Sequence, residues 1–292
     1  AQAIATGVMD VVVASGVEMM SRIPMKTNRL GRDELGPMFA QEMPEGLISQ
    51  GISAELIASR WELSRGKLDA FSARSHQRAA RARDSGYLSD AIVPVEVDGA
   101  TVTADEGIRD TTTEEILQTL RPAFERADML ERFPQIDWRV TAGNSSQVTD
   151  GAAATLVVSE EALERYGLTP RGKIVGMSVV GDDPIMMLTG IIPATQKVLQ
   201  QTGIRLEDIS VAEINEAFAS VVLAWCEEYP MDEGLVNPWG GAIAYGHPVG
   251  ASGGRLLANL LGFLEHSKGK YGLWSMCESG GMANATILES VR

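Results

Sequence analysis

The sequence predicts a layered α/β fold, because segments typical of strands alternate with segments typical of helices along the second half of the 292-residue chain. Runs rich in β-branched residues, such as 173–180 and 209–214, are typical of strands. Apolar residues at helical spacing lie between such runs, most clearly over 252–266. The hydrophobic content of 45% fits a globular protein, and no apolar run approaches the roughly 20 residues that a membrane span requires.

The first half of the chain is expected to begin with the end of a helix and a short buried strand at 11–14. From about residue 27 to about residue 139 the sequence is polar, charged and interrupted, so we predict an inserted subdomain there. Within it, 53–83 has helical periodicity, and Ser64 is placed to cap the second of two helices. Residues 91–97 are expected to form an edge strand, because proline within the run cannot donate to a sheet.

The elements of the second half alternate regularly after a turn of small polar residues. Residues 140–150 form that turn. The expected strands are 151–159, 173–180, 209–214, 271–276 and 283–289, and the expected helices are 159–166 (capped by Ser159), 193–202, 217–229 and 252–266.

The charge and the cysteine content exclude several classes of function. A net charge of −14 argues against a nucleic-acid surface, although backbone N–H groups can still hold an anionic ligand. Two cysteines cannot make a disulfide framework and indicate a reducing compartment. With three histidines they show no metal-ligand spacing. The first twenty residues lack a signal peptide, so we expect a cytoplasmic protein without a membrane partner or a metal.

Two side chains are suited to moving protons near neutral pH. His247 precedes Pro248 in the glycine-rich segment 237–255, and the proline keeps its backbone extended. Such a histidine can act as a general base, or it can be a structural residue bonded to the backbone. Cys277 lies between an apolar strand and a glycine turn, where a thiol can project into a cleft at a sheet edge or remain buried and inert. Cys226, in a helical segment, fits the inert alternative.

Two further segments carry polar side chains whose function is open. Asn215 falls where a strand ends and a helix begins, so it can cap that helix, with Ala217 and Phe218 in the first turn. Alternatively, its amide can hold an oxyanion or a water. Ser146 lies in the turn 145–147, which by itself indicates ordinary turn chemistry.

Taken together and in order, four segments resemble the thiolase family, which makes or cleaves 3-oxoacyl-CoA thioesters. They are TAGNSSQVTDGAAA (141–154), EINEAFAS (213–220), NPWGGAIAYGHPVGASG (237–253) and CESGGM (277–282). GVEMMSR and GISAELIASRWELSRGKLDAFSARSHQRA also match, so the resemblance covers essentially the whole chain.

The resemblance implies a five-layered αβαβα core of two similar halves with an inserted loop domain. On this basis residues 1–26 are a remnant of the N-terminal half and residues 27–147 are a loop domain that binds CoA. Residues 148–169 return to the N-terminal half, and residues 170–292 form the C-terminal half. The first strands of the N-terminal half are missing, so we expect that half to be incomplete.

The resemblance also implies roles for individual residues. Thiolases use one cysteine as an acylated nucleophile and another as a general acid/base. Cys277 matches the acid/base, and His247 matches the residue that activates the nucleophile. Asn215 would position the water of an oxyanion hole shared with His247, and the backbone N–H of Ser279 would contribute to a second oxyanion hole.

For the substrate, Ser146 matches a serine that lies along the pantetheine of CoA, and Phe218 would line that pocket. The implied partners are 3-ketoacyl-CoA, acetyl-CoA and CoA as co-substrates, with no permanently bound cofactor. A homodimer or homotetramer is expected. Ser49 and Gln50 replace the His-Met pair of relatives specialised for acetoacetyl-CoA, which favours a degradative 3-ketoacyl-CoA thiolase.

The nucleophilic cysteine is absent and would be expected shortly upstream of Ala1. The alternatives are a truncated gene product or incomplete gene model, one piece of a split or clipped enzyme, and a noncatalytic relative that binds acyl-CoA or a partner protein. The first two are favoured because His247, Cys277 and Asn215 are retained. The chain alone is then expected to be inactive. A ketoacyl synthase fits less well, since that class pairs two histidines with one cysteine.

The CESGG segment also departs from the C-x-G-G-G pattern of the family. If Ser279 must adopt a positive φ, it costs about 1 kcal/mol or more and displaces the oxyanion donor; if φ is negative, serine is harmless. Glu278 would raise the pKa of Cys277 if it faced inward, but we expect it to be exposed.

Overall fold

The structure is a computed structural model that describes residues 1–32 and 35–291. Its centre is a four-stranded sheet with strand order β5-β8-β7-β6, in which β6 and β7 are parallel and the other neighbours antiparallel. The strands are β5 (Gly172–Gly181), β6 (Ile209–Ile214), β7 (Tyr271–Cys277) and β8 (Met282–Ser290). The strands predicted at 173–180, 209–214, 271–276 and 283–289 are these four, and they are confirmed to within one residue at each end.

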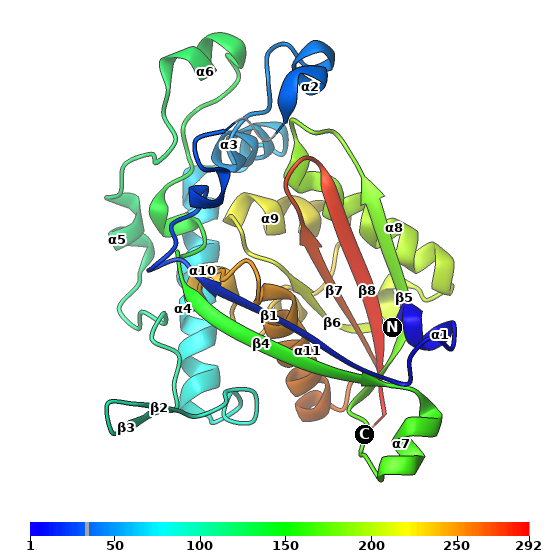
Figure 1. The fold of residues 1–292 in the computed structure, drawn as a ribbon. Coiled ribbons are helices and arrows are strands. Elements are labelled where there is room, and N and C mark those ends of the chain that lie inside the picture. Colours follow the sequence, from blue (N-terminus) through cyan, green and yellow to red (C-terminus); the bar gives the residue numbers. More distant parts are fainter. Residues whose placement is uncertain (33–34, 292) are drawn as a thin grey trace.

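Helices account for most of the remaining regular structure (Figure 1). The α-helices are α1 (Gln2–Ala5), α2 (Gly36–Glu42), α3 (Gln50–Arg60), α4 (Arg65–Asp84), α5 (Glu114–Gln118), α6 (Ala127–Arg132), α7 (Glu160–Tyr166), α8 (Ile191–Thr202), α9 (Ala219–Glu228), α10 (Ala242–Tyr245) and α11 (Ser252–Ser267). Short 3-10 turns occur at Thr27–Arg29, Ala142–Asn144, Met187–Gly190, Leu206–Asp208 and Glu233–Leu235. The predicted caps are confirmed, since Ser64 Oγ accepts from the N–H of Lys67 and Ser159 Oγ from the N–H of Ala162.

The four-stranded sheet has helices on both faces. A Cβ at Gly272 would lie 2.9 Å from the side chain of Leu260, so this face of β7 touches α11. Leu273, the next residue along β7, points to the other face and belongs to a core cluster with Val198 of α8. α9 contributes Trp225 to the same cluster.

A two-stranded antiparallel ribbon packs on the opposite side of α11. It pairs β1 (Val11–Met19) with β4 (Asp150–Val158), beginning with Val11 opposite Val158. Figure 1 shows the ribbon crossing in front of α11. A Cβ at Gly254 of α11 would lie 2.6 Å from the Cβ of Ala153, so helix and ribbon are in close contact. Ribbon, helix, sheet and helices therefore follow one another as alternating β and α layers.

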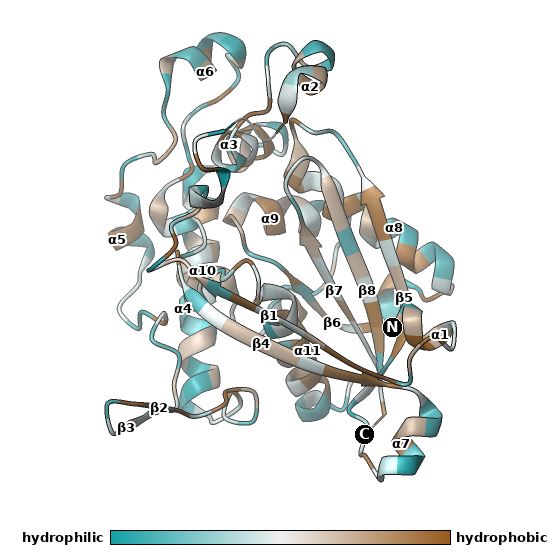
Figure 2. Cartoon of the chain, in the orientation of Figure 1, coloured by the Kyte–Doolittle hydropathy of each residue, from teal (hydrophilic) through white to brown (hydrophobic). Residues whose placement is uncertain are grey.

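A strand does form at 11–14, but the prediction that this strand is buried is wrong. The outward side chains of the ribbon are exposed, with 63% for Val13, 68% for Val17 and 54% for Leu156. Figure 2 shows the hydrophobic colouring of this ribbon where β1 begins and β4 ends. The reason is that α11 covers one face only, and nothing else among residues 1–32 and 35–291 covers the other face of these side chains.

Between β1 and β4 the chain makes a long excursion that includes α3 and α4. The edge strand predicted for 91–97 is shorter than expected and does not join either main sheet. Only Val95–Val97 is a strand (β2), paired with β3 (Ala100–Val102) in an exposed hairpin. The turn residues Asp98 and Gly99 have φ of 49° and 82°, which closes the hairpin tightly and leaves it apart from the core.

Candidate active site at the carboxyl edge of the sheet

The imidazole of His247 is held at both ring nitrogens. Its Nδ1 lies 2.5 Å from Oγ of Ser252, and its Nε2 lies 3.2 Å from Nδ2 of Asn215. The Ser252 hydroxyl also donates to the carbonyl of Pro248, over 2.9 Å. Because that hydroxyl has one hydrogen, Nδ1–H of the ring is the donor to Ser252, and Nε2 presents its lone pair to the Asn215 amide. The ring is therefore fixed as a neutral base with its free electron pair on Nε2.

Burial keeps this imidazole neutral. Removal from water lowers the pKa of His247 from 6.5 to about 4, and the positive charge of Arg255 lowers it further. The ring is therefore held on both sides by its surroundings, and the same bonds leave Nε2 able to accept a proton.

Gln147 holds the backbone of His247 in place. The N–H of His247 donates to the carbonyl of Gln147 over 3.0 Å, and the side-chain oxygen of Gln147 accepts from the guanidinium of Arg109 over 3.0 Å. Its amide nitrogen lies 2.8 to 3.0 Å from three carbonyl oxygens, those of Gly107, Ile243 and Ala244. We call this arrangement the Gln147 clamp. It ties the residue-107 loop and the end of α10 to the turn that carries His247.

Glycine allows this turn to approach the ribbon closely. A Cβ at Gly16 of β1 would lie 1.7 Å from the carbonyl oxygen of Gly250, and a Cβ at Gly151 would lie 2.7 Å from the ring of Pro248. Gly246, with φ of +88°, leaves no space for a side chain beside Thr149. The glycine-rich segment thus reflects close backbone approach, as the sequence predicts.

Cys277 and Asn215 lie at the same edge of the four-stranded sheet. β6 and β7 are parallel, and the N–H of Asn215 donates to the carbonyl of Ser275 over 3.0 Å. Asn215 follows the last residue of β6, and Cys277 is the last residue of β7, so both occupy the carboxyl ends of neighbouring parallel strands. This edge is where α/β sheets commonly bind ligands. The structure therefore brings His247, Asn215 and Cys277 to one region.

The thiol of Cys277 is buried, and this changes its acidity. Burial raises the pKa of Cys277 from 9 to about 12, and the carboxylate of Glu278 contributes in the same direction. An apolar environment disfavours the thiolate, so the sulfur holds its proton at neutral pH.

Asn215 is not a helix cap. α9 begins at Ala219 with Phe218 as its N-cap residue, and no side chain caps it. The segment before it stays extended, because Ser145 forms a β-bridge with Phe218 and the N–H of Ser146 donates to the carbonyl of Ala217 over 2.9 Å. The Asn215 amide is free to face His247 as a result, and its Oδ1 is buried with no hydrogen-bond partner among the described residues.

Ser146 and Phe218 are brought together by these same bonds. Ser146 is half-buried. The buried ring of Phe218 packs edge-on against Phe124, with 5.9 Å between ring centroids. Two segments that are far apart in the sequence thus form adjacent walls beside the Asn215 backbone.

Ser279 does not require a left-handed backbone. It is exposed, and it is not among the non-glycine residues with positive φ. The left-handed positions of this turn are Gly280 and Gly281, with φ of 82° and 89°. The serine is therefore harmless to the backbone. Glu278 is half-buried rather than exposed, it accepts a hydrogen bond from the Asn284 amide, and burial raises the pKa of its carboxyl.

Sequence reasoning missed two residues that build this site. Ser252 is fully buried in the first turn of α11, and a polar residue five positions after His247 was the available signal. Glu216 is buried beside Asn215 and accepts from the Ser75 hydroxyl, the N–H of Ile243 and the Asn237 amide, over 2.7 to 3.1 Å. A charged residue directly after an apolar strand was the corresponding signal.

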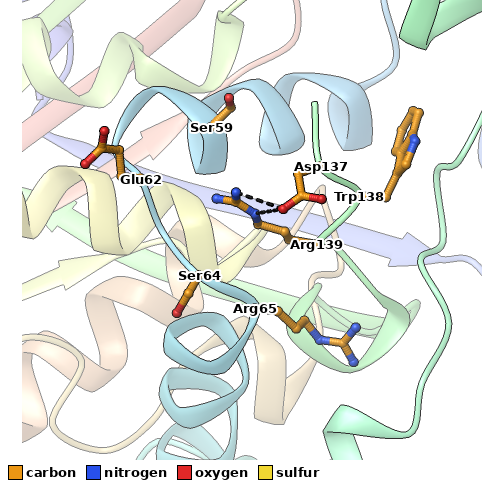
Figure 3. Close-up of a pocket in the computed structure, with 7 residues that line it drawn as sticks. All are labelled: Ser59, Glu62, Ser64, Arg65, Asp137, Trp138 and Arg139. Atoms are coloured by element: carbon orange, nitrogen blue, oxygen red, sulfur yellow. Dashed lines mark hydrogen bonds and ion pairs between the residues drawn. The ribbon is translucent and has the colours of Figure 1, made fainter. Parts of the chain in front are cut away.

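A pocket of about 710 Å³ lies elsewhere, between α3, the start of α4 and the 137–139 segment (Figure 3). It contains none of the predicted site residues; its lining is Ser59, Glu62, Ser64, Arg65, Asp137, Trp138 and Arg139. Its arginines are already paired, since Arg139 binds Asp137 and Arg65 binds Asp69. It is therefore a weaker candidate for an anionic ligand than the sheet edge.

Across 1–32 and 35–291, no group of three or more His, Cys, Asp or Glu side chains is arranged to hold a metal ion. In the same part of the chain, no helix has the length and apolar character to cross a membrane.

Comparison with known proteins places these features in context. A model described as the thiolase N-terminal domain matches residues 1–161, and one described as the thiolase C-terminal domain matches residues 168–290. Steroid 3-ketoacyl-CoA thiolase FadA6 of Mycobacterium tuberculosis is 42% identical over 99% of this chain and 70% of its own length. Acetyl-CoA acetyltransferase of Shinella zoogloeoides is 40% identical over 99% of this chain and 74% of its own.

A solved structure agrees with these matches. Human mitochondrial 3-ketoacyl-CoA thiolase in complex with CoA superposes with a TM-score of 0.86 at 36% identity, covering 99% of this chain and 73% of the human one.

Proposed function

The chain belongs to the thiolase family, and from this premise we propose that it serves CoA-dependent cleavage of a 3-ketoacyl-CoA to acetyl-CoA and a shortened acyl-CoA, or the reverse condensation. Its relatives are acyltransferases of this type. The observation that carries the proposal is the neutral imidazole of His247, fixed between Asn215 and Ser252 at the sheet edge that also holds Cys277.

The protonation states of this resting site suit the first half of such a reaction. A neutral His247 can take the proton of a nucleophilic thiol through Nε2. The resulting thiolate attacks the 3-keto carbonyl, the C2–C3 bond breaks, and its electron pair remains on the acetyl-CoA enolate. Cys277 enters this step protonated, so its thiol can give that enolate a proton.

The second half returns the proton. The thiol of an incoming CoA gives its proton to the Cys277 thiolate, and the CoA sulfur then attacks the acyl group on the nucleophile. The acyl–CoA bond forms as the acyl–enzyme bond breaks and releases the nucleophile as a thiolate, to which His247 returns the proton that it took in the first half. Because burial raises the pKa of Cys277 to about 12, its thiolate is a strong base for this step.

Charge on the substrate oxygens needs fixed donors. We assign Asn215 and His247 to one oxyanion hole, and the backbone N–H of Ser279 to another, because each lies at the carboxyl edge beside the proposed reaction centre. The negative or extended φ at Ser279 is compatible with that role.

Ser146 and Phe218 are proposed to contact the pantetheine arm of CoA, and residues 27–147 to form the loop domain that binds it. The adjacency of these two residues supports this assignment. Ser49 caps α3, and with Gln50 it supports a degradative 3-ketoacyl-CoA thiolase, as do the names of the Mycobacterium tuberculosis and Bacillus subtilis relatives.

We further propose that the nucleophilic thiol comes from a polypeptide segment outside residues 1–292. The chain has two cysteines, and Cys226 lies half-buried on α9, where burial raises its pKa to about 11. The exposed apolar face of the β1/β4 ribbon offers a surface for additional structure. We also propose a homodimer or homotetramer in the cytoplasm, which light scattering and fractionation of cell extract can test.

Thiolysis of acetoacetyl-CoA and of a longer 3-ketoacyl-CoA tests the function. We expect no turnover by residues 1–292 alone, and turnover when a family segment carrying the nucleophilic cysteine is added in trans or fused. Cys277→Ser should abolish this turnover. Cys226→Ser is the matched control and should retain it, because Cys226 lies on α9, apart from the proposed site.

The second candidate function is a noncatalytic scaffold that binds acyl-CoA or a partner protein. The absent second thiol at the site favours it. Binding of CoA in calorimetry without turnover by any complemented form would support the scaffold. Turnover that persists in Cys277→Ser would instead contradict the chemistry proposed above.

A further inference from the structure

A group of buried polar atoms beside the site has no hydrogen-bond partners among the described residues, although the Arg255 guanidinium also lies over the ring of Tyr245, 5.7 Å from its centroid. Both carboxyl oxygens of Glu213, all three guanidinium nitrogens of Arg255 and the amide nitrogen of Asn259 are buried, and among the described residues none of them has a hydrogen-bond partner. The whole Glu213 residue is inaccessible to solvent. Buried charged groups without partners are rare because each costs its full desolvation free energy.

These atoms share one interface, that between β6 and α11. Arg255 and Asn259 are four residues apart on α11, so they lie on the same side of the helix. On β6, Val211 packs in a cluster with Leu260 and Leu264 of α11. Glu213 is two positions further along the strand, so its side chain points toward the same helix.

Arg255 acts electrostatically on Glu213, but the two side chains do not touch. Burial raises the pKa of Glu213 to about 8, and the positive charge of Arg255 lowers it by less, so this carboxyl group keeps its proton at neutral pH. In the described part of the chain no ion pair within 4.0 Å joins either of them to another side chain. A buried carboxyl group and a guanidinium that do not touch, each with unused donors or acceptors, form the kind of polar site in which ordered water is commonly found.

The group also lies next to the two residues that hold the ring of His247. Ser252, which binds Nδ1 of the ring, is one turn before Arg255 on α11. Asn215, which faces Nε2, is two residues beyond Glu213 at the end of β6. The separation of α11 and β6 therefore sets the distance between the two partners of the imidazole.

We propose that Glu213, Arg255 and Asn259 enclose ordered water molecules that bridge them, and that this hydrated cluster is a positioning element that holds Ser252 and Asn215 on the ring of His247. The inference deepens the proposed function by naming residues that act through His247 without touching substrate. Other charged or titratable groups that act on this cluster are Asp105, Arg78, Glu216 and Tyr245.

A high-resolution crystal structure tests the water directly. We expect density for water within hydrogen-bond distance of both the Glu213 carboxyl group and the Arg255 guanidinium. Direct contact between these two groups, or an interface without water, would overturn the proposal.

Nuclear magnetic resonance of the histidine rings tests the positioning role without any turnover. The chain has three histidines, so each ring can be assigned. Arg255→Met should change the ring-nitrogen shifts of His247 and raise its pKa by on the order of one pH unit. Arg255→Lys should retain much of the original pattern, and His266 is the internal control.

A second variant covers the case in which Arg255→Met fails to fold. Glu213→Gln preserves shape and should still alter the His247 signals, because an amide NH2 replaces one carboxyl oxygen to which the bridging waters bind. Unchanged His247 signals in both Arg255→Met and Glu213→Gln would refute the positioning role. Neither readout depends on the reaction, so such a result would leave the proposed function to its own test.

Discussion

Two adjacent glycines at the start of α11 allow a matched test of how this helix packs on the β1/β4 ribbon. A Cβ at Gly254 would lie 2.6 Å from the Cβ of Ala153, whereas a Cβ at Gly253 would meet nothing within 4 Å. Neither glycine has a positive φ. Gly254→Ala therefore adds a methyl group against β4, and Gly253→Ala adds the same group in open space.

The expected magnitudes follow from these distances. Either alanine gains up to about 1 kcal/mol from helix propensity. An ordinary carbon contact is 3.4–4 Å, so the new methyl at Gly254 must push Ala153 or α11 away by about an ångström. Overpacking of this kind costs typically 1–3 kcal/mol. Gly253→Ala should therefore be stabilising, Gly254→Ala neutral or destabilising, and the two should differ by roughly 2 kcal/mol.

Urea denaturation followed by circular dichroism measures this difference, with both variants compared with the parent chain. Equal stability of Gly254→Ala and Gly253→Ala would refute the reasoning, because it would mean that α11 does not contact β4 at Ala153. It would also remove the basis for the stacked order of ribbon, helix and sheet.

Three further predictions concern stability at low pH, the alkylation of Cys277 at high pH, and the Gln147 clamp. Burial lowers the pKa of both His247 and His76 to about 4, so each contributes roughly 3 kcal/mol of stability above pH 6.5 that is lost as the pH falls through 4. Urea unfolding at several pH values should show this loss, and His247→Gln should flatten it. Burial raises the pKa of Cys277 to about 12, so iodoacetamide should modify this thiol slowly at pH 8 and faster as the pH rises. Peptide mass spectrometry measures the rate of modification, and rapid modification at neutral pH would contradict the buried state of the thiol. Gln147→Glu should cost about 2 kcal/mol or more, because its carboxylate would face three carbonyl oxygens, and an unchanged unfolding midpoint would argue against the clamp.

The secondary structure was largely predictable because its signals are local. Hydrophobic spacing predicted β6, β7 and α11 to within one residue, and the side chain of Ser159 predicted the start of α7. Burial was less predictable, because it depends on which other elements cover a strand. The run of valines at 11–13 is typical of a buried strand, yet in this structure one face of it has no cover.

For the candidate site, the sequence indicated which residues to consider but not the hydrogen bonds that connect them. The motifs around His247 and Cys277 indicated the chemistry, and the parallel pairing of β6 with β7 brings Asn215 to the same edge as Cys277. The local pattern at Asn215 suggested a helix cap, but the bridge between Ser145 and Phe218 delays the helix. The spacing of residues along the sequence does not predict hydrogen bonds between segments that are far apart in the chain.

The Gln147 clamp has a consequence for motion. The carbonyl of Gly107 and the guanidinium of Arg109 bind the side chain of Gln147, and the N–H of His247 binds the backbone carbonyl of the same residue. Residues 107 and 109 therefore cannot shift as a rigid unit without straining the histidine turn. Any rearrangement that a ligand imposes on this excursion of the chain is transmitted mechanically to the histidine turn through this one residue.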